Sequence, residues 1–170
     1  LLLREPEIFR PQLRAILRAS EERYRAIFEK NASIQYLMNV CDGRIVDANP
    51  AACAFYGYTR ERMKQLHISD INTMWQSKQH EILAKARNEG CPRFEFRHRL
   101  ADGQIREVES YLCTLTIDGR ECLYAVVHDI TARKQTEAEL NKEQVLVRTL
   151  MENVPEHIYF KDAESRFVMI

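Results

Sequence analysis

Apolar and polar residues alternate most regularly between residues 94 and 100. One side of this segment carries Phe94, Phe96, His98 and Leu100, and the other carries Glu95, Arg97 and Arg99. Side chains of a β-strand point alternately to opposite faces, so a period of two predicts a strand with one covered face and one solvated face. His98 is the only polar member of the inward row, which makes it a candidate for chemistry.

Two longer strands are expected to follow, at about residues 104–117 and 121–130. The turn sequences Ala101-Asp102-Gly103 and Asp118-Gly119 precede them, since Asp-Gly pairs favour tight turns. The central parts of both strands are almost continuously apolar, which is typical of strands covered on both faces. We therefore expect either the N-terminal helix or a partner subunit on the outer face of this sheet.

The first half of the chain predicts a helix, a hairpin and small helices. A helix is expected from Pro11 to about Asn31, followed by strands at 34–40 and 44–47 around the turn Cys41-Asp42-Gly43. Asn49-Pro50 predicts a helix start, because Asn accepts hydrogen bonds at the N-cap and Pro fits the first helical position. Further helices are expected at 51–55, 60–66 and 76–88, the last ending at Gly90.

From Thr131 the pattern changes to one long helix that ends before Pro155. Leu140, Val147 and Val154 recur every seven residues, with Gln144 and Met151 between them. This spacing favours a short coiled-coil seam, although Gln144 interrupts its apolar character. The alternative is a single amphipathic helix packed on its own domain.

The layout of residues 24–46 returns at residues 146–168. Phe28, Asn31, Arg44 and Val46 correspond to Leu150, Asn153, Arg166 and Val168. Repeats of this kind indicate tandem modules joined by a helix. We expect residues 150–170 to be the truncated start of a second module, and the chain to be a fragment of a longer protein.

Several short stretches occur in a characteristic order between residues 20 and 134. They are a helical segment at 20–29, Asp47-Ala48-Asn49-Pro50-Ala51-Ala52, Phe55-Tyr56-Gly57-Tyr58, Glu95-Phe96-Arg97, Asp102-Gly103 and Asp129-Ile130-Thr131-Ala132-Arg133-Lys134. In combination they resemble the PAS domain family. The resemblance implies an α+β fold, with a five-stranded antiparallel sheet, small helices on one face and a connector helix at each end.

The expected domains are a helical connector at 1–19, a PAS domain at 20–131, a coiled-coil-like signalling helix at 132–149 and the truncated module. The resemblance implies a non-catalytic sensory and dimerisation module of a bacterial sensor histidine kinase or diguanylate cyclase, working as a homodimer linked to an output domain. Asp129 and Thr131 would relay a change in the sheet to the outgoing helix, because Thr131 is able to cap its N-terminus. The alternative is a ligand-free structural dimerisation linker.

The amino-acid composition limits the kinds of binding partner and the cellular compartment that we expect for this chain. The 25 basic and 25 acidic residues cancel, so nothing global favours nucleic acid or an anionic membrane surface. The apolar runs are too short to cross a bilayer. The five cysteines have no paired spacing, and with no export signal they favour reduced thiols in the cytoplasm and no metal site.

The candidate ligand site lies on the expected inner face of the sheet. Its residues are Phe96, His98, Ser110, Leu112 and Thr114, because a few polar groups in an apolar wall are typical of small-molecule sites. A hydrogen-bonded core histidine is the alternative for His98. The ligand is not identified by the sequence, and it is open whether one exists.

Cofactors and catalysis find little support in the sequence. His80 falls near the position of the axial histidine of haem-binding PAS sensors, but Gln76, Lys78, Gln79 and Glu81 surround it, which favours a solvated histidine over a haem ligand. The Asn-Cys-Arg-Phe-Leu-Gln segment of flavin photosensors is absent. We find no nucleophile with a base, phosphate loop, metal-binding helix or paired acids, so no catalytic residues are expected.

Overall fold

The computed structural model describes residues 9–153, 160–164 and 166–169. Two compact units meet between Ile130 and Thr131. The second unit contains helix α6 (Thr131–Asn153) and the paired strands β6 (Phe160–Lys161) and β7 (Phe167–Met169). Val154, the last position of the expected seam, lies outside the described residues, as do residues 1–8 of the expected connector.

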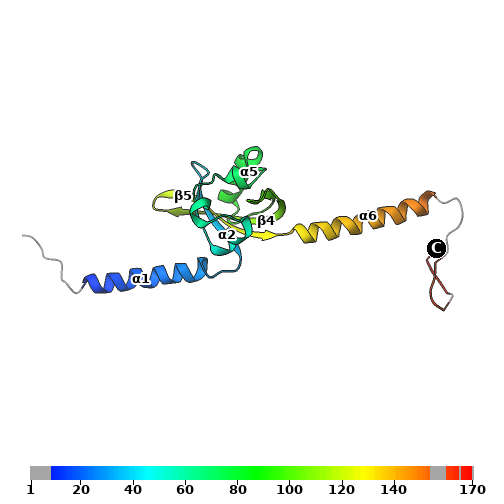
Figure 1. The fold of residues 1–170 in the computed structure, drawn as a ribbon, viewed down its shortest axis with the longest axis horizontal. Helices are drawn as coiled ribbons and strands as arrows, with labels where there is room; N and C mark the ends of the chain where they lie inside the picture. The colour runs from blue at the N-terminus through cyan, green and yellow to red at the C-terminus, as the bar shows by residue number, and fades with distance from the viewer. Residues whose placement is uncertain (1–8, 154–159, 165, 170) are drawn as a thin grey trace, which may run out of the picture. The chain divides into compact units, whose positions relative to one another are not determined.

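The first unit begins with a helix and a hairpin, continues through small helices and ends in long strands (Figure 1). Its elements are α1 (Phe9–Phe28), β1 (Ile34–Asn39), β2 (Ile45–Ala48), α2 (Pro50–Tyr56), α3 (Arg60–Met63), α4 (Ile68–Ile71), α5 (Trp75–Asn88), β3 (Arg93–Arg99), β4 (Ile105–Ile117) and β5 (Arg120–Asp129). Helix α4 was not expected. Its N-cap is His67, whose ring accepts from the Ser69 amide, and histidine is not among the side chains that usually signal a helix start.

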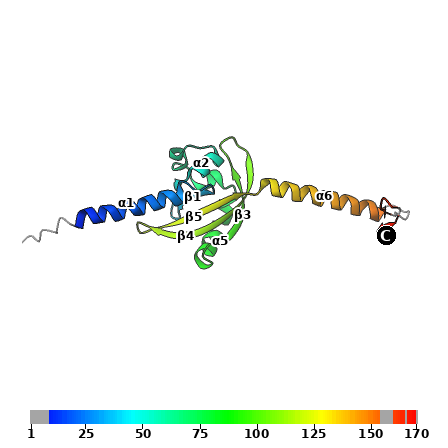
Figure 2. The ribbon, with the colours of Figure 1, turned by 90° about the horizontal axis from the view of Figure 1, so that it is seen from below.

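The five strands form one antiparallel sheet in the order β2-β1-β5-β4-β3. Figure 2 shows β1, β5 and β4 side by side. The last two strands meet at a tight turn in which Asp118 and Gly119 both have positive φ, as the Asp-Gly sequence predicts. The expected α+β fold is confirmed.

The core lies between one face of the sheet and the small helices. Met38, Val108 and Leu123 of the sheet belong to the same buried cluster as Tyr56 of α2 and Trp75 and Ile82 of α5. Because strand side chains alternate, the neighbouring residues of these strands occupy the opposite, outer face. The inner face is therefore the place where a buried site would form.

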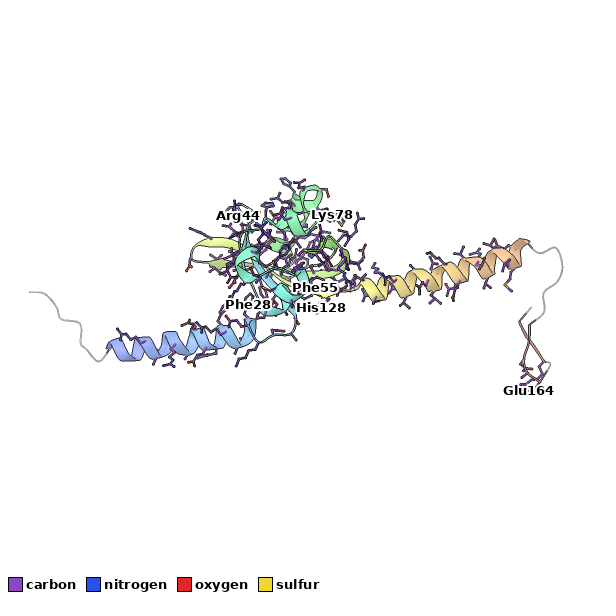
Figure 3. All side chains as sticks on the ribbon, viewed as in Figure 1. Phe28, Arg44, Phe55, Lys78, His128 and Glu164 are labelled. Carbon is purple, nitrogen blue, oxygen red and sulfur yellow. A yellow bond between two sulfur atoms is a disulfide. The ribbon has the colours of Figure 1, made fainter. Side chains whose placement is uncertain are left out.

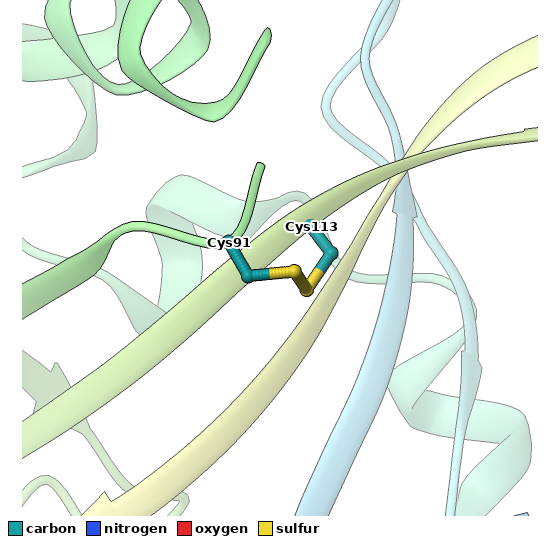
Figure 4. Close-up of a disulfide and its surroundings, with 2 residues drawn as sticks. All are labelled: Cys91 and Cys113. Atoms are coloured by element: carbon teal, nitrogen blue, oxygen red, sulfur yellow. A yellow bond between two sulfur atoms is a disulfide. The ribbon is translucent and has the colours of Figure 1, made fainter. Parts of the chain in front are cut away.

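Cysteine chemistry differs from the sequence expectation. Cys91 and Cys113 form a disulfide (Figure 4), whereas Cys41, Cys53 and Cys122 are free thiols. In the register of β3 and β4, Arg93 faces Tyr111. Two residues before Arg93 and two residues after Tyr111, the same register places Cys91 opposite Cys113. The expectation of reduced thiols was wrong for this pair, because only strand pairing brings together two cysteines 22 residues apart.

Candidate functional site

The five predicted ligand residues all lie on two neighbouring strands. Phe96 and His98 belong to β3, and Ser110, Leu112 and Thr114 belong to β4. The first four are buried and Thr114 is partly buried. They do not form one tight cluster, because His98 faces Arg106 near one end of the β3–β4 ladder, whereas Thr114 faces Leu123 of β5.

His98 is the polar centre of this inner face. Its side chain is 0% exposed, and its Nδ1 lies 2.8 Å from the hydroxyl oxygen of Tyr56. The ring of Phe96 stacks on the imidazole, with centroids 5.9 Å apart. Burial lowers the pKa of His98 to about 3, because a charged imidazolium would lose its hydration. The ring is therefore neutral at physiological pH.

Two polar atoms of the inner face have unmet hydrogen-bonding capacity. The Nε2 atom of His98 and the Oγ atom of Ser110 are buried without a hydrogen-bond partner among the described residues. Buried polar atoms are nearly always paired with protein or ordered water. Both atoms are therefore places where water or a polar group of a ligand would be stabilised.

The segment between α4 and α5 closes the edge of β3 beside His98. Asn72 forms an antiparallel bridge with His98, and the Thr73 amide donates to the Arg97 carbonyl at 3.1 Å. The side chain of Asn72 is buried and accepts from the Met74 amide. Sequence reasoning missed Tyr56 and Asn72 as neighbours of His98, because neither lies near it along the chain.

His80 is not placed where a haem ligand is needed. It is exposed on α5, and that helix turns Trp75, Ile82 and Ala86 into the core. An axial ligand has to point into a pocket large enough for the porphyrin, so these residues do not fit the group. Within the described part of the chain, no three His, Cys, Asp or Glu residues are grouped to hold a metal ion.

Asn49 joins three segments at a point where α1 meets the sheet. Its Oδ1 accepts from the Ala52 amide at 2.9 Å, as the predicted N-cap of α2, and also from the Gln35 amide at 3.1 Å. Its Nδ2 donates to the carbonyls of Phe28 and Ser33 at 3.1 and 2.8 Å. The labelled Phe28 marks this end of α1 in Figure 3.

A second contact ties the same region to α3. Arg60 donates from Nε and Nη2 to both carboxylate oxygens of Asp47, at 2.8 and 2.7 Å. The same guanidinium reaches Glu29 at 3.2 Å. Burial alone would raise the pKa of Asp47, but the hydrogen bonds from Arg60 and from the Ala48 amide outweigh it, so the pKa is lowered. The end of α1 is thus bonded both to the hairpin and to the helical layer.

The outer face of the sheet carries an apolar groove. Its volume is about 260 Å³, and it is lined by Tyr24, Ile27, Phe28, Leu37, Leu115, Ile117 and Tyr124. Helix α1 thus contributes one wall and strands β1, β4 and β5 the other. The sequence expectation that either the N-terminal helix or a partner subunit covers this face is met in part by the last turn of α1.

The residues predicted to relay a signal, Asp129 and Thr131, lie where the sheet ends. Asp129 is the last residue of β5, and its Oδ2 is 3.9 Å from Nη1 of Arg106. The Ile130 amide donates to the Glu107 carbonyl at 2.9 Å. Thr131 is the first residue of α6. The corner is therefore held to β4 up to the residue before the helix.

Comparison with known proteins places these features in a family. The PAS domain model matches residues 34–132. The diguanylate cyclase DgcM of Escherichia coli K12 is 38% identical over 121 residues, which cover 69% of this chain and 29% of that protein. Sporulation kinase E of Bacillus subtilis is 30% identical over 129 residues, covering 76% and 17%. The chain therefore spans less than a third of these relatives.

Solved structures agree with the fold. The crystal structure of the PAS domain of an HTR-like protein from Haloarcula marismortui has a TM-score of 0.61 and 21% identity, covering 71% of this chain and 99% of that one. At this identity the likeness concerns the fold alone. Among the described residues, no helix has the length and apolar character that crossing a membrane requires.

Replacing Asn49 tests the junction between α1, β1 and α2. Asn49→Ala removes a helix cap and leaves buried backbone groups unpaired, so we expect the free energy of unfolding to fall by about 3 kcal/mol. Asn39→Ala is the matched control, since the Asn39 side chain makes a local hydrogen bond, accepted from the Cys41 amide two residues further along the chain. Urea unfolding would measure both, and equal losses would contradict a special role for Asn49.

The buried His98 ring predicts a loss of stability in acid. The pKa of His98 is about 3 when folded and 6.5 in its ordinary state, so the unfolded chain binds one more proton between these values. The free energy of unfolding should therefore fall as pH drops through this window, with a slope of about one proton from this residue. Urea unfolding at a series of pH values measures the slope, which should be smaller in His98→Gln.

Tyr56→Phe separates burial from hydrogen bonding in this experiment. The variant removes the hydroxyl next to Nδ1 but keeps an aromatic ring beside the imidazole, tilted against it. Because burial is the cause of the low pKa of His98, we expect the wild-type slope in Tyr56→Phe. Identical slopes in wild type and His98→Gln would show that His98 is not a buried neutral ring.

Proposed function

This chain belongs to the PAS domain family, and from that premise we propose that it is the non-catalytic sensory and dimerisation module of a bacterial signalling protein. Its similarity to a diguanylate cyclase and a sporulation kinase supports an output domain of one of these kinds. In this proposal the output domain acts on the signal, and the PAS domain supplies binding and a change of conformation.

The ligand in this proposal occupies the inner face of the sheet. The buried Nε2 of His98 and Oγ of Ser110 are the observation that carries it, since buried polar atoms without partners are costly unless something pairs with them. The neutral His98 ring would offer a hydrogen bond but no charge. A small, mainly apolar molecule with an uncharged polar group fits this environment best.

A ligand-free dimerisation linker is the second candidate function. The close packing of Tyr56, Trp75 and Ile82 beneath the sheet favours it, because all three are almost completely buried. In this case single ordered waters would satisfy His98 and Ser110. Haem is not proposed as a ligand of His80, since this side chain is exposed.

Dimerisation is proposed to use α6. Its apolar residues are exposed in the single chain, with Leu140 at 55% and Val147 at 51%. A shallow pocket on the same side of the helix is lined by Leu140, Gln144, Val147 and Met151, together with charged neighbours. A second copy of the helix would bury this seam. A ligand-driven shift at Asp129 would then pass through Thr131 into the pairing of the two helices.

Native mass spectrometry of the purified chain tests the sensory proposal. We expect a dimer that carries one extra small mass per subunit, and we expect that mass to be lost from a His98→Phe, Ser110→Ala double variant. Circular dichroism would establish that the variant still folds. A dimer without added mass, also after exposure to a metabolite library, would favour the linker. An added mass that survives in the folded double variant would place the ligand elsewhere.

Charge on the seam tests helix pairing. Leu140→Asp with Val147→Asp would place carboxylates in the paired surface, so we expect the dimer to dissociate in sedimentation velocity experiments. Val145→Asp with Leu146→Asp is the matched control, because these exposed apolar residues lie off the seam and the change of charge is the same. If the seam variant remains dimeric, or if both variants dissociate alike, pairing through this seam is wrong.

A further inference from the structure

The disulfide between Cys91 and Cys113 has no role in ligand sensing or helix pairing as proposed above. Cys91 lies in the short connection between α5 and β3 and is exposed, while Cys113 lies on β4 and is partly buried. Their Cα atoms are 4.4 Å apart, which is typical of directly opposed residues in an antiparallel pair. The bond therefore fastens the end of the edge strand to its neighbour.

We propose that Cys91 and Cys113 form a redox site that exchanges with a small thiol–disulfide couple of the glutathione type. In the reduced chain both residues are thiols, and in the oxidised chain they form the disulfide seen here. The site would thus respond to the redox state of its surroundings: the connection between α5 and β3 would be covalently linked to β4 in the oxidised chain and not in the reduced chain. This inference does not depend on a bound ligand or on dimerisation.

Thiol–disulfide exchange between the two cysteines and a small disulfide reagent proceeds in two steps. The Cys91 thiolate attacks a sulfur of the disulfide reagent and expels one small thiolate, which leaves a mixed disulfide on Cys91. The Cys113 thiolate then attacks the Cys91 sulfur and expels the second small thiolate. The two protein thiols give up two electrons and two protons, and the reagent is reduced to two thiols. Reduction of the protein follows the same steps in reverse.

Exposure selects Cys91 as the sulfur that meets the reagent. The residues before it, Glu89 and Gly90, are exposed as well, so a tripeptide thiol has access to its side chain. Cys122 is buried, and desolvation raises the pKa of its thiol. Cys53 is half-buried, with its pKa raised by the same cause. Both are poorer nucleophiles than a solvated thiol at neutral pH.

Strand pairing keeps the two cysteines together when the bond is open. The ladder between β3 and β4 runs from the Arg99–Ile105 pair to the Arg93–Tyr111 pair. Beyond it, the Leu112 amide donates to the Pro92 carbonyl at 3.2 Å. These backbone bonds do not involve the sulfur atoms, so the reduced thiols remain opposed and the disulfide is able to re-form. This geometry distinguishes a reversible pair from two unrelated thiols.

Cys113 lies next to the apolar groove on the outer face of the sheet, so opening the disulfide would affect that groove. Cys113 pairs with Tyr124 of β5 and is two residues from Leu115 on the same face of β4. Both Tyr124 and Leu115 line the apolar groove. Opening the disulfide would therefore remove the covalent link at the sheet edge next to this groove.

Redox titration of the full 170-residue chain tests the inference. The protein is equilibrated in buffers of stepped reduced-to-oxidised glutathione ratio, its thiols are trapped by alkylation, and the trapped sites are mapped by mass spectrometry. We expect Cys91 and Cys113 to lose their thiols together over one transition that is reversed by returning to the reducing buffer. Hydrogen exchange in residues 89–93 should be slower in the oxidised chain.

Two variants separate the pair from general cysteine oxidation. Cys91→Ser should abolish the joint transition, whereas Cys41→Ser, which removes another exposed thiol, should leave it unchanged. If the thiols of Cys91 and Cys113 could still be alkylated in the most oxidising buffer, the proposal would be overturned. A disulfide that persists in the most reducing buffer would also overturn it, because the bond would then be a permanent link.

Discussion

The buried side-chain amide of Asn49 connects α1, the loop after it, β1 and α2. It donates to carbonyls at the end of α1 and in the following loop, and it accepts from the amides of Gln35 in β1 and Ala52 in α2. Because the residue is 0% exposed, water is not available to replace these bonds. Asn49 therefore fixes the end of α1 to the sheet, together with the Arg60–Glu29 contact and the packing of α1 along the apolar groove.

Strand β4 carries residues of both the proposed ligand site and the proposed redox pair. Its inward residues Ser110 and Leu112 belong to the core face, and its outward residues Tyr111 and Cys113 face the opposite side. A strand transmits displacement directly, because alternate side chains share one backbone. A ligand beneath the sheet and a redox event above it would thus act on the same strand, and Glu107 of that strand holds the Ile130 corner.

Local patterns predicted much of the fold and only part of the site. The alternation around Phe96 and His98 predicted an inward histidine, and the structure buries it. The Asn49-Pro50 sequence predicted the start of α2, but not the contacts of Asn49 with Phe28 and Gln35. Cap and turn signals act over a few residues, whereas those contacts join segments separated by 14 to 21 residues.

The sequence by itself determined the α+β class, the order of the elements apart from α4, the inward row of β3 and the resemblance to the PAS family, since periodicity and turn chemistry are properties of neighbouring residues. Only the tertiary structure decided that Tyr56 meets His98, that Arg60 clamps Asp47 and that Cys91 bonds to Cys113. These pairs depend on strand register and on the packing of helices over the sheet. Both arise from the burial of the whole core, which no short stretch of sequence specifies.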